Sequence, residues 1–442
     1  MAPEQAIGRL YSERLPMQQL FDDLQWRGLV YDSTEGLKEL LARERLTTYI
    51  GFDPTAASLH VGSLLPMVML ARLQRHGHPP IALVGGGTGM IGDPSGKATE
   101  RSLLTLEQVE ANVAGIRTQL SRFLDFDDAA TPARLVNNAE WLTKLSAIEF
   151  MRDIGKHFTV NYMLAKESVK RRSESDEGIS YTEFSYLLLQ SYDFLVMHDR
   201  FTCTVQMGGS DQWGNITAGV DLIRRLRSSK AHGLVMPLIT TASGTKFGKT
   251  EAGAVWLDPN LTSPFRFYQF WLNTDDSDAV RYLKFFTFLD RPAIERLEGA
   301  TRTSPESREA QRALAREVTR MVHGEEHVLR AERASAVLFG EDISMLPADD
   351  VLSVFDDVPS SSVAAASLAG EGVAVVELLA SSGLTASKGE ATRLIRGGGV
   401  YVNNRRITDE RARLRSADAI EGRLFVLRKG AKQNHVVKIA TG

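Results

Sequence analysis

The segment His60–Ser63 contains a histidine, a glycine and a serine, residue types that suit the binding of a phosphorylated ligand. An apolar pattern at helical spacing starts at Leu64 and runs to about His76. A glycine at a helix start lets backbone N–H groups and the helix dipole face an anion with no Cβ in the way. We therefore expect a nucleotide-phosphate site where this helix begins.

A second basic segment, Lys246–Thr250, lies in a Gly-containing loop and carries Lys246 and Lys249 three residues apart. Two such cations can clamp a triphosphate as negative charge develops on the leaving pyrophosphate, which stabilises the transition state. The alternative is that the two lysines are solvated and serve only solubility.

The segment Gly87–Gly92 reads G-x-G-x-x-G after a predicted strand, which is the pattern of a dinucleotide-binding turn. Asp93 and Pro94 follow directly, and a proline at that point interrupts the helix that such a turn requires. We therefore predict a loop whose backbone lies close to a ligand, with the carboxylate of Asp93 directed at a cation.

Two predicted helices carry further polar candidates. Tyr186, Gln190 and Asp193 are spaced i, i+4 and i+7, so they share one face of a helix that is otherwise apolar. That face either meets water or lines a pocket. Asp211 lies in the first turn of the next predicted helix, where it suits a polar ligand but also fits an ordinary helix start after Ser210.

The elements that position these residues alternate between strand and helix patterns, which predicts a Rossmann-like α/β domain with a parallel sheet. The predicted strands are the run that begins at Thr47, then Pro80–Val84, Ala133–Val136, Phe201–Met207 and Leu234–Ile239. Sites in such sheets lie at the carboxyl ends of the strands.

The pattern becomes wholly helical from Pro264 to Leu338, and an acidic segment with seven Asp or Glu and no Lys or Arg follows at 340–372. Residues 373–442 contain 13 Lys or Arg and 6 Asp or Glu, although the whole chain has a net charge of −3. A basic module on an acidic body indicates a polyanionic partner at that end. The expected division is an N-terminal tail at 1–16, a catalytic domain at 17–262, a helical domain at 263–340, an acidic linker at 341–372 and a small α+β domain at 373–442.

Composition excludes several classes of protein. The single cysteine, Cys203, rules out an internal disulfide framework and fits a reducing compartment. No apolar run approaches the roughly 20 residues that span a bilayer, so no membrane partner is expected. The histidines are scattered; His323 and His327 could share one helix face, but without a carboxylate signature we expect no metal site and no zinc.

The order of these motifs resembles that of bacterial-type tyrosyl-tRNA synthetases, a family of class I aminoacyl-tRNA synthetases. His60–Ser63 matches the first class I signature, Lys246–Thr250 matches the second, and Tyr49–Thr55 points to the tyrosyl branch. The resemblance covers the chain from about Met17 onward. It implies that tyrosine and ATP form tyrosyl-adenylate and pyrophosphate, and that tyrosine then passes to the 3'-terminal ribose of tRNA(Tyr).

The resemblance also implies a role for each matching residue. The residues implied in positioning the substrates and stabilising charge during adenylate formation are Thr55, His60, Lys97, Arg101, Lys246 and Lys249. The residues implied in tyrosine binding are Tyr49, Asp93, Tyr186, Gln190, Asp193 and Gln212. The residues implied in ATP binding are Gly51, Asp53, Gly62, Ser63, Asp211, Lys246 and Lys249.

The basic C-terminal module resembles the RNA-binding fold first known from a small-subunit ribosomal protein, and the helical domain would bind the anticodon. The RNA-binding candidates are Lys388, Arg393, Arg396, Arg405 and Arg406; a solvated basic face is the alternative. The resemblance further implies Mg²⁺ accompanying ATP, a homodimer and a cytoplasmic location.

One departure from the family pattern concerns Ser63, which replaces the second histidine of the first signature. Two other functions remain open at this point. A tryptophanyl-tRNA synthetase has similar signatures, although Tyr49, Asp193 and the basic C-terminal module argue against it. The second open function is that of a synthetase-like RNA-binding protein that lacks catalytic activity. Asp93 and the lysines of the 246–250 loop argue against it.

Overall fold

The computed structural model describes residues 14–95, 105–174, 178–242, 244, 247–250, 253–338, 343, 346–355, 358–430 and 433–440. The chain folds into two compact units. One unit comprises Met1–Leu261 with Thr274–Val322, and the other comprises Thr262–Asn273 with His323–Gly442. The helical segment predicted at 263–340 therefore contributes to both units, and the boundaries expected from the sequence stay a prediction.

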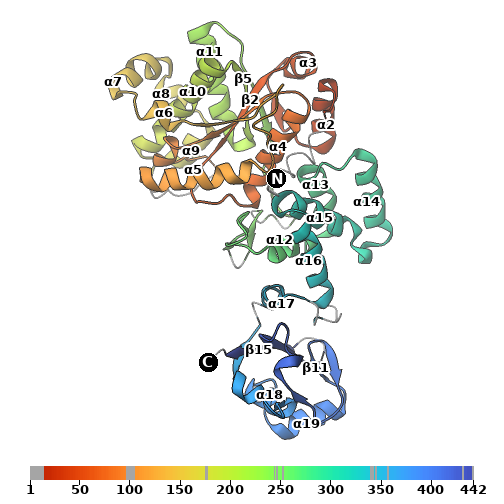
Figure 1. Ribbon diagram of the computed structural model, residues 1–442. Helices are drawn as coiled ribbons and strands as arrows, with labels where there is room; N and C mark the ends of the chain where they lie inside the picture. Colours follow the sequence, from red (N-terminus) through yellow and green to blue (C-terminus); the bar gives the residue numbers. More distant parts are fainter. Residues whose placement is uncertain are drawn as a thin grey trace. The chain divides into compact units, whose positions relative to one another are not determined.

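The first unit is built on a six-stranded sheet with the strand order β1-β6-β5-β2-β3-β4 (Figure 1). The strands are β1 (Asp32–Ser33), β2 (Thr47–Phe52), β3 (Pro80–Val84), β4 (Arg134–Asn137), β5 (Cys203–Gly209) and β6 (His232–Met236). All neighbours pair in parallel except β1, which pairs with β6 in the antiparallel sense. The expected α/β fold with a parallel sheet is confirmed, and β1 was not expected.

Four helices connect the parallel strands: α4 (Leu64–Arg75), α5 (Leu106–Leu120), α10 (Tyr181–Phe201) and α11 (Trp213–Arg227). The chain moves from β2 to β3 and β4 in one direction and from β5 to β6 in the other. Because such crossovers are right-handed, α4 and α5 cover one face of the sheet, and α10 and α11 cover the other. The order reverses between β2 and β5, which is where open α/β sheets bind ligands.

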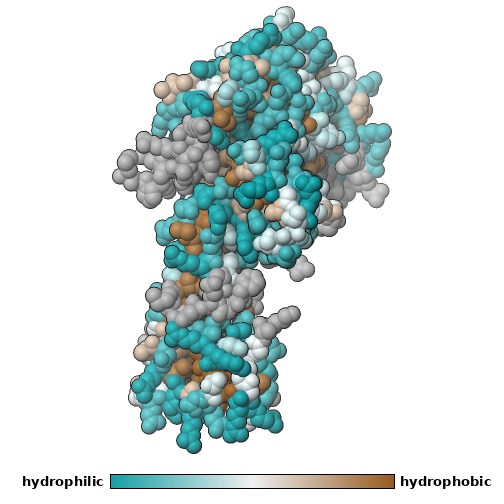
Figure 2. Space-filling model, turned by 90° about the vertical axis from the view of Figure 1, so that its right-hand side faces the viewer, coloured by the Kyte–Doolittle hydropathy of each residue, from teal (hydrophilic) through white to brown (hydrophobic). Residues whose placement is uncertain are grey.

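The remaining helices of the first unit are short or lie outside the sheet crossovers. They are α2 (Leu20–Arg27), α3 (Leu37–Arg43), α6 (Ala139–Leu142), α7 (Ala147–Glu149), α8 (Val160–Leu164), α9 (Glu167–Ser173), α13 (Asp276–Phe286), α14 (Arg291–Thr303) and most of α15 (Glu309–His323). On the face drawn in Figure 2 the surface is mainly hydrophilic, with hydrophobic side chains in small separate patches.

The second unit contains helices and a five-stranded sheet of its own. Its helices are α12 (Pro264–Leu272), α16 (Glu325–Leu338), α17 (Ala348–Val354), α18 (Val375–Ser381) and α19 (Lys388–Arg396). Its five-stranded sheet has the order β12-β11-β14-β15-β9, with β9 (Ser360–Ala364), β11 (Val400–Val402), β12 (Arg405–Ile407), β14 (Leu424–Lys429) and β15 (Gln433–Ala440). The predicted helices and the strand at 400–402 are found within a small α+β fold, as expected.

The acidic segment 341–372, expected to be a linker, contains both α17 and β9. Strand β9 pairs in parallel with β15, from Val436–Ser360 to Ala440–Ala364. The serine-rich sequence resembles a linker because β9 is an edge strand with alternate residues exposed, and its pairing partner lies more than 70 residues away. This segment is therefore part of the C-terminal fold where the structure describes it.

Candidate active site

The candidate residues come together at the carboxyl ends of the central strands of the first unit. Asp53 follows β2, the glycine loop that leads to Asp93 follows β3, and Asp211 with Gln212 follows β5. The stripe predicted on the buried helix lies on α10, which packs on β5. Segments far apart in the sequence therefore meet where the strand order reverses.

Asp193 is the most deeply buried carboxylate of this site, with an exposed fraction of 2%. Each of its oxygens accepts one hydrogen bond: Asn138 Nδ2 donates to Oδ2 at 2.8 Å, and Trp141 Nε1 donates to Oδ1 at 2.8 Å. Burial raises the pKa of Asp193 to about 7, and the two donors offset part of that rise. The carboxylate is thus held in one orientation with lone pairs left for a further donor.

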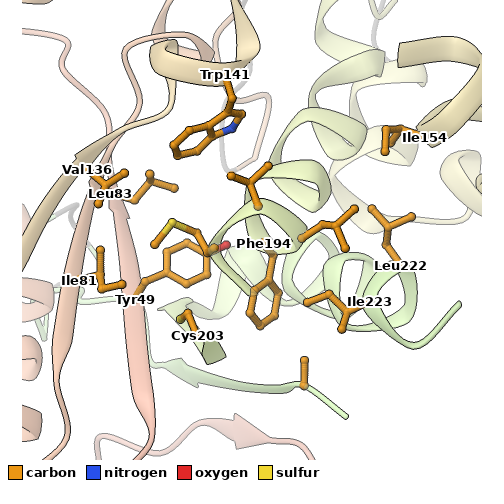
Figure 3. Close-up of a cluster of buried hydrophobic side chains, with 14 residues drawn as sticks. Tyr49, Ile81, Leu83, Val136, Trp141, Ile154, Phe194, Cys203, Leu222 and Ile223 are labelled. Carbon is orange, nitrogen blue, oxygen red and sulfur yellow. The ribbon is translucent and has the colours of Figure 1, made fainter. Parts of the chain in front are cut away.

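Tyr49, on β2, lies in a buried hydrophobic cluster that also includes Phe194 and Trp141 (Figure 3). Its ring centroid is 5.4 Å from that of Phe194. The Tyr49 hydroxyl is buried and has no hydrogen-bond partner among the described residues. Burial, and secondarily the charge of Asp193, raise the pKa of this phenol well above its ordinary value. A buried hydroxyl without a partner is costly, so this end of the site suits a ligand with its own hydroxyl.

Asn138 joins this end of the site to the glycine loop. It donates to Thr88 Oγ1 at 2.9 Å as well as to Asp193, and its Oδ1 accepts from Gly87 N at 2.7 Å. One side chain therefore fixes a helix carboxylate and the loop after β3 together.

Asp93 lies in the glycine loop that follows β3. Its Oδ2 accepts from Gln212 Nε2 at 2.7 Å, and its Oδ1 accepts from Ser95 N at 2.8 Å. Burial, followed by the charge of Asp53, raises the pKa of Asp93 to about 6. The expectation that Asp93 faces a cation stays a prediction, because its partners in the structure are neutral donors.

Asn215 connects two further candidates to this network. Its Nδ2 donates to Gln190 Oε1 at 2.9 Å and to Gln212 Oε1 at 3.2 Å. Tyr186, one turn before Gln190 on α10, is buried as well. Of the stripe predicted from spacing, Gln190 therefore has a polar partner on α11, and Asp193 has its partners in Asn138 and Trp141.

His60 and Gly62 form the turn that precedes α4. His60 is the N-cap of a short 3₁₀ helix (Val61–Ser63), and its Nδ1 accepts from Gly62 N at 2.9 Å. A Cβ on Gly62 would lie 2.6 Å from the imidazole ring, closer than real Cβ contacts. A side chain at position 62 would therefore displace the His60 ring, and the expectation that Gly62 faces a phosphate stays a prediction.

The second signature lies against the first. Val61 N donates to Val255 O at 2.9 Å, and Val255 N donates to Gly248 O at 3.2 Å. Gly248 has a φ of +81°, and a Cβ on it would lie 2.7 Å from Val61 Cγ2. The loop that contains Gly248 is thus packed on the segment that contains His60.

Several candidates cannot be placed by their side chains. Lys97, Arg101 and Lys246 lie outside the described residues, and Lys249 is described only by its backbone, in β7 (Lys249–Thr250). Of the other nucleotide candidates, Thr55 is exposed in the loop after β2. Gly51 is exposed in β2, and Ser63 is partly buried in the turn after His60.

Sequence reasoning missed Asn138, Trp141, Asn215 and Gln206. Gln206 is paired with Tyr49 in the sheet register, so both side chains lie on one face; its buried Oε1 has no partner among the described residues. Asn138 comes directly after β4, so its place after a predicted strand was a usable signal. Trp141 carried no signal in the pattern.

The RNA-binding candidates are all exposed in the second unit. Lys388 pairs with Glu377 at 2.7 Å and Arg396 pairs with Glu410 at 2.7 Å. Exposed pairs of this kind contribute little and exchange readily with other anions. Arg406 Nε donates to Gly398 O at 2.7 Å, which fixes its position beside the glycine turn.

Within the described ranges, no group of three or more His, Cys, Asp or Glu is arranged to hold a metal ion. Among the helices that the structure describes, none has the length and apolar character to cross a membrane. Cys203 is buried, and burial raises the pKa of its thiol to about 12.

Comparison with known proteins matches this arrangement to a family. A model of class I tRNA synthetases (W and Y) matches residues 41–340, and a model of the tyrosine–tRNA ligase C-terminal domain matches residues 350–437. The tyrosine–tRNA ligase of Roseiflexus castenholzii is 57% identical over 423 residues, which cover 96% of this chain and 100% of that protein.

Two further comparisons agree with these matches. The tyrosine–tRNA ligase of Bacillus caldotenax is 53% identical over 426 residues, covering 95% of this chain and 100% of that protein. The solved structure of a C-terminally truncated mitochondrial tyrosyl-tRNA synthetase from Coccidioides posadasii aligns with a TM-score of 0.62 at 35% identity, covering 71% of this chain and 91% of that chain. This chain therefore belongs to the tyrosine–tRNA ligase family of class I aminoacyl-tRNA synthetases.

Proposed function

We propose that the chain activates L-tyrosine with ATP at the carboxyl ends of β2, β3 and β5 and transfers tyrosine to the 3'-terminal ribose of tRNA(Tyr). The observation that carries this proposal is the buried pair of Asp193 and Tyr49. Asp193 is oriented by two donors, and the Tyr49 hydroxyl has no partner in the described part of the chain. In a chain of the tyrosine–tRNA ligase family, this pair suits hydrogen bonding to the phenol group of a bound tyrosine.

The phenol of tyrosine would donate to Asp193 and meet the hydroxyl of Tyr49. Phenylalanine would leave the Tyr49 hydroxyl without a partner and Asp193 without the added donor, and buried polar groups left unpaired in this way give strong discrimination. Tyrosyl-tRNA synthetases are the standard example of this effect, with rejection of phenylalanine by roughly 10⁵. Tryptophan has no hydroxyl at this position, so the same argument disfavours it.

At the other end of the amino acid, the ammonium group would bind Asp93 together with the polar groups of α10. The residues proposed for this contact are Asp93, Tyr186 and Gln190, and Gln212 is proposed on the carboxylate side of the amino acid. The hydrogen bonds that already join Asp93 to Gln212, and Gln190 to Asn215, keep these groups oriented before tyrosine arrives. Pre-orientation lowers the entropic cost of binding.

The chemical step needs no nucleophile or base from the protein. A carboxylate oxygen of tyrosine attacks the α-phosphorus of ATP, and the bond from that phosphorus to pyrophosphate breaks. The chain would supply positioning and positive charge. The residues proposed for this role are Thr55, His60, Lys97, Arg101, Lys246 and Lys249, and those proposed to hold ATP are Gly51, Asp53, Gly62, Ser63 and Asp211. Mg²⁺ enters with ATP as part of the substrate.

The second unit is proposed to hold tRNA. The exposed basic residues Lys388, Arg393, Arg396, Arg405 and Arg406 suit a phosphate backbone, for which affinity falls as salt rises. The helices of 263–340 are proposed to bind the anticodon.

Dimerisation is proposed through the segment that contains α7 and α8. Four apolar side chains there are strongly exposed: Ile148, Met151, Val160 and Leu164, at 67%, 50%, 60% and 43%. Exposed apolar clusters commonly mark protein interfaces. Light scattering tests this directly, since a monomer at micromolar concentration would contradict the proposed homodimer. A cytoplasmic location is part of the same proposal.

The test of the proposed function is amino-acid-dependent ATP–pyrophosphate exchange, measured with tyrosine, tryptophan and phenylalanine in parallel. Exchange with tyrosine alone is expected. Exchange with tryptophan would contradict the roles given to Tyr49 and Asp193. Folded protein that binds RNA but gives no exchange with any of the three would indicate a protein without catalysis.

A further inference from the structure

Helix α5 contacts the loop that leads from β2 to His60 through one face. Asn112 Nδ2 donates to Pro54 O at 2.8 Å. Gly115 lies so close to this loop that a Cβ on it would be 2.0 Å from Ala57 O. Gln119 makes two bonds to the same loop, so residues 112, 115 and 119 form one helical stripe against it.

The two bonds of Gln119 reach consecutive residues. Its Oε1 accepts from Leu59 N at 2.8 Å, and its Nε2 donates to Ser58 Oγ at 2.8 Å. Ser58 and Leu59 are both buried, at 4% and 5% exposure. Both polar ends of one amide therefore fix the backbone directly before His60.

The Ser58 hydroxyl is fully used at this junction. It donates to Leu59 O at 2.8 Å, accepts from Gln119 Nε2, and accepts from Asp258 N at 3.2 Å. Leu59 O also accepts from Leu257 N at 2.9 Å. One donor and two acceptor positions are the full capacity of a hydroxyl, so a change at Gln119 disturbs three chain segments at once.

The junction continues directly into both signatures. His60 and Trp256 form an antiparallel bridge, and Val61 N donates to Val255 O. Val255 N then donates to Gly248 O in the lysine loop. A shift of Leu59 would therefore be passed both to His60 and to the backbone of the second signature.

We propose that Gln119 is a positioning residue for adenylate formation, acting through Ser58 and Leu59. Gln119 holds the loop that carries Thr55 and leads into His60. This loop and the second signature are thereby kept in the relative position that ATP binding requires. The inference rests on the proposed function, since it assigns a role in that same reaction.

The test compares two substitutions in the full-length chain. Gln119→Met keeps the side-chain volume but leaves Leu59 N and Ser58 Oγ without these partners. Gln119→Glu keeps an acceptor for Leu59 N. Because a displacement of about 1 Å in a positioning element can cost roughly 100-fold in rate, we expect Gln119→Met to lower kcat for tyrosine-dependent ATP–pyrophosphate exchange by about 10- to 100-fold. The tyrosine KM and equilibrium tyrosine binding should stay within about twofold, and Gln119→Glu should recover part of kcat.

A matched control is Gln108→Met in the first turn of the same helix, which removes the bond from Thr105 N to Gln108 Oε1 at 3.0 Å and should leave exchange unchanged. If Gln119→Met does not fold, Asn112→Ala replaces it; this variant removes only the bond to Pro54 O and should lower kcat severalfold.

Three results would overturn the role of Gln119: an unchanged kcat, a loss confined to tyrosine KM, or no recovery in Gln119→Glu. Absence of exchange in the unsubstituted chain would instead contradict the proposed function, so the two failures are distinguishable.

Discussion

The two ends of the proposed site are built in different ways. At the phenol end, Asp193 on α10 and Tyr49 on β2 are buried, and the orientation of Asp193 depends on two side-chain donors, Asn138 and Trp141. At the phosphate end, the turn at His60 depends on backbone hydrogen bonds and on glycines that leave no room for a Cβ.

This difference matches the two tasks proposed for the site. Discrimination of a hydroxyl needs dry, fixed partners, because only then does a missing hydroxyl leave a penalty. Stabilisation of phosphate charge needs close approach of the backbone and of cationic side chains, which glycines allow. Changes at the phenol end should therefore alter which amino acid reacts, and changes at the phosphate end should alter how fast it reacts.

The largest effect is expected for Gly62→Ala at the phosphate end. The new Cβ would lie 2.6 Å from the His60 ring, so this ring must move and its bond from Gly62 N is disturbed. We expect kcat for pyrophosphate exchange to fall by about 100-fold or more, with tyrosine binding unchanged. Gly299→Ala on α14 is the control, because a Cβ there meets nothing within 4 Å. Weaker tyrosine binding in Gly62→Ala would show that the two ends are not separable.

A smaller effect is expected for Trp141→Phe at the phenol end. The substitution removes the Nε1 donor to Asp193 Oδ1 and leaves that oxygen without its partner, at a cost of about 1–3 kcal/mol. Tyrosine KM should rise about tenfold or more in the exchange assay, while ATP KM stays unchanged. A change in ATP KM alone would contradict the division between the two ends.

The pH dependence of tyrosine affinity should separate the two carboxylates. The proposed contacts need Asp193 and Asp93 ionised, and burial raises their pKa values to about 7 and about 6. Tyrosine affinity should therefore rise with pH from 5.5 to 8, by calorimetry or fluorescence. In Asp193→Asn, only the increase in tyrosine affinity that follows the ionisation of Asp93, centred near pH 6, should remain. Affinity that is flat or falls over this range would contradict both assignments.

The raised pKa of Asp193 also predicts how the stability of the tyrosine-free protein changes with pH. Because the folded state binds the Asp193 proton more tightly than the unfolded state, its contribution to stability is present below pH 4 and is lost as pH rises to about 7.

The smallest effect is expected for Ser63→His, which restores the histidine of the family signature. Ser63 is partly buried, and its N donates to His60 O at 2.8 Å, a bond that the substitution keeps. ATP KM and the exchange rate should change by less than they do in His60→Ala. An equal or larger loss in Ser63→His would show that serine has its own essential contact.

The parts of this fold that follow from local pattern were accessible to prediction. The strand at Tyr49, the helix after Ser63 and the stripe of Tyr186, Gln190 and Asp193 are set by apolar periodicity and spacing, and each is present in the structure. The α/β alternation also predicted a parallel sheet with its sites at the carboxyl ends of the strands, whereas the strand order came only from the structure.

The rest depends on contacts between distant segments. Trp141 reaches Asp193 from 52 residues away, and no local pattern marks it as a partner. Strand β9 exists because β15 pairs with it, and its sequence alone resembles a linker. Gln119 likewise stands in an ordinary helix, and only its two bonds to the loop before His60 distinguish it.

The most direct test of the central claim is the ratio of kcat/KM for tyrosine to that for phenylalanine, measured by pyrophosphate exchange in the unsubstituted chain and in Asp193→Asn. If Asp193 reads the phenol, the ratio should fall by about 100-fold or more in the variant, with the loss confined to tyrosine. A ratio that is unchanged, with both amino acids slowed equally, would contradict the account.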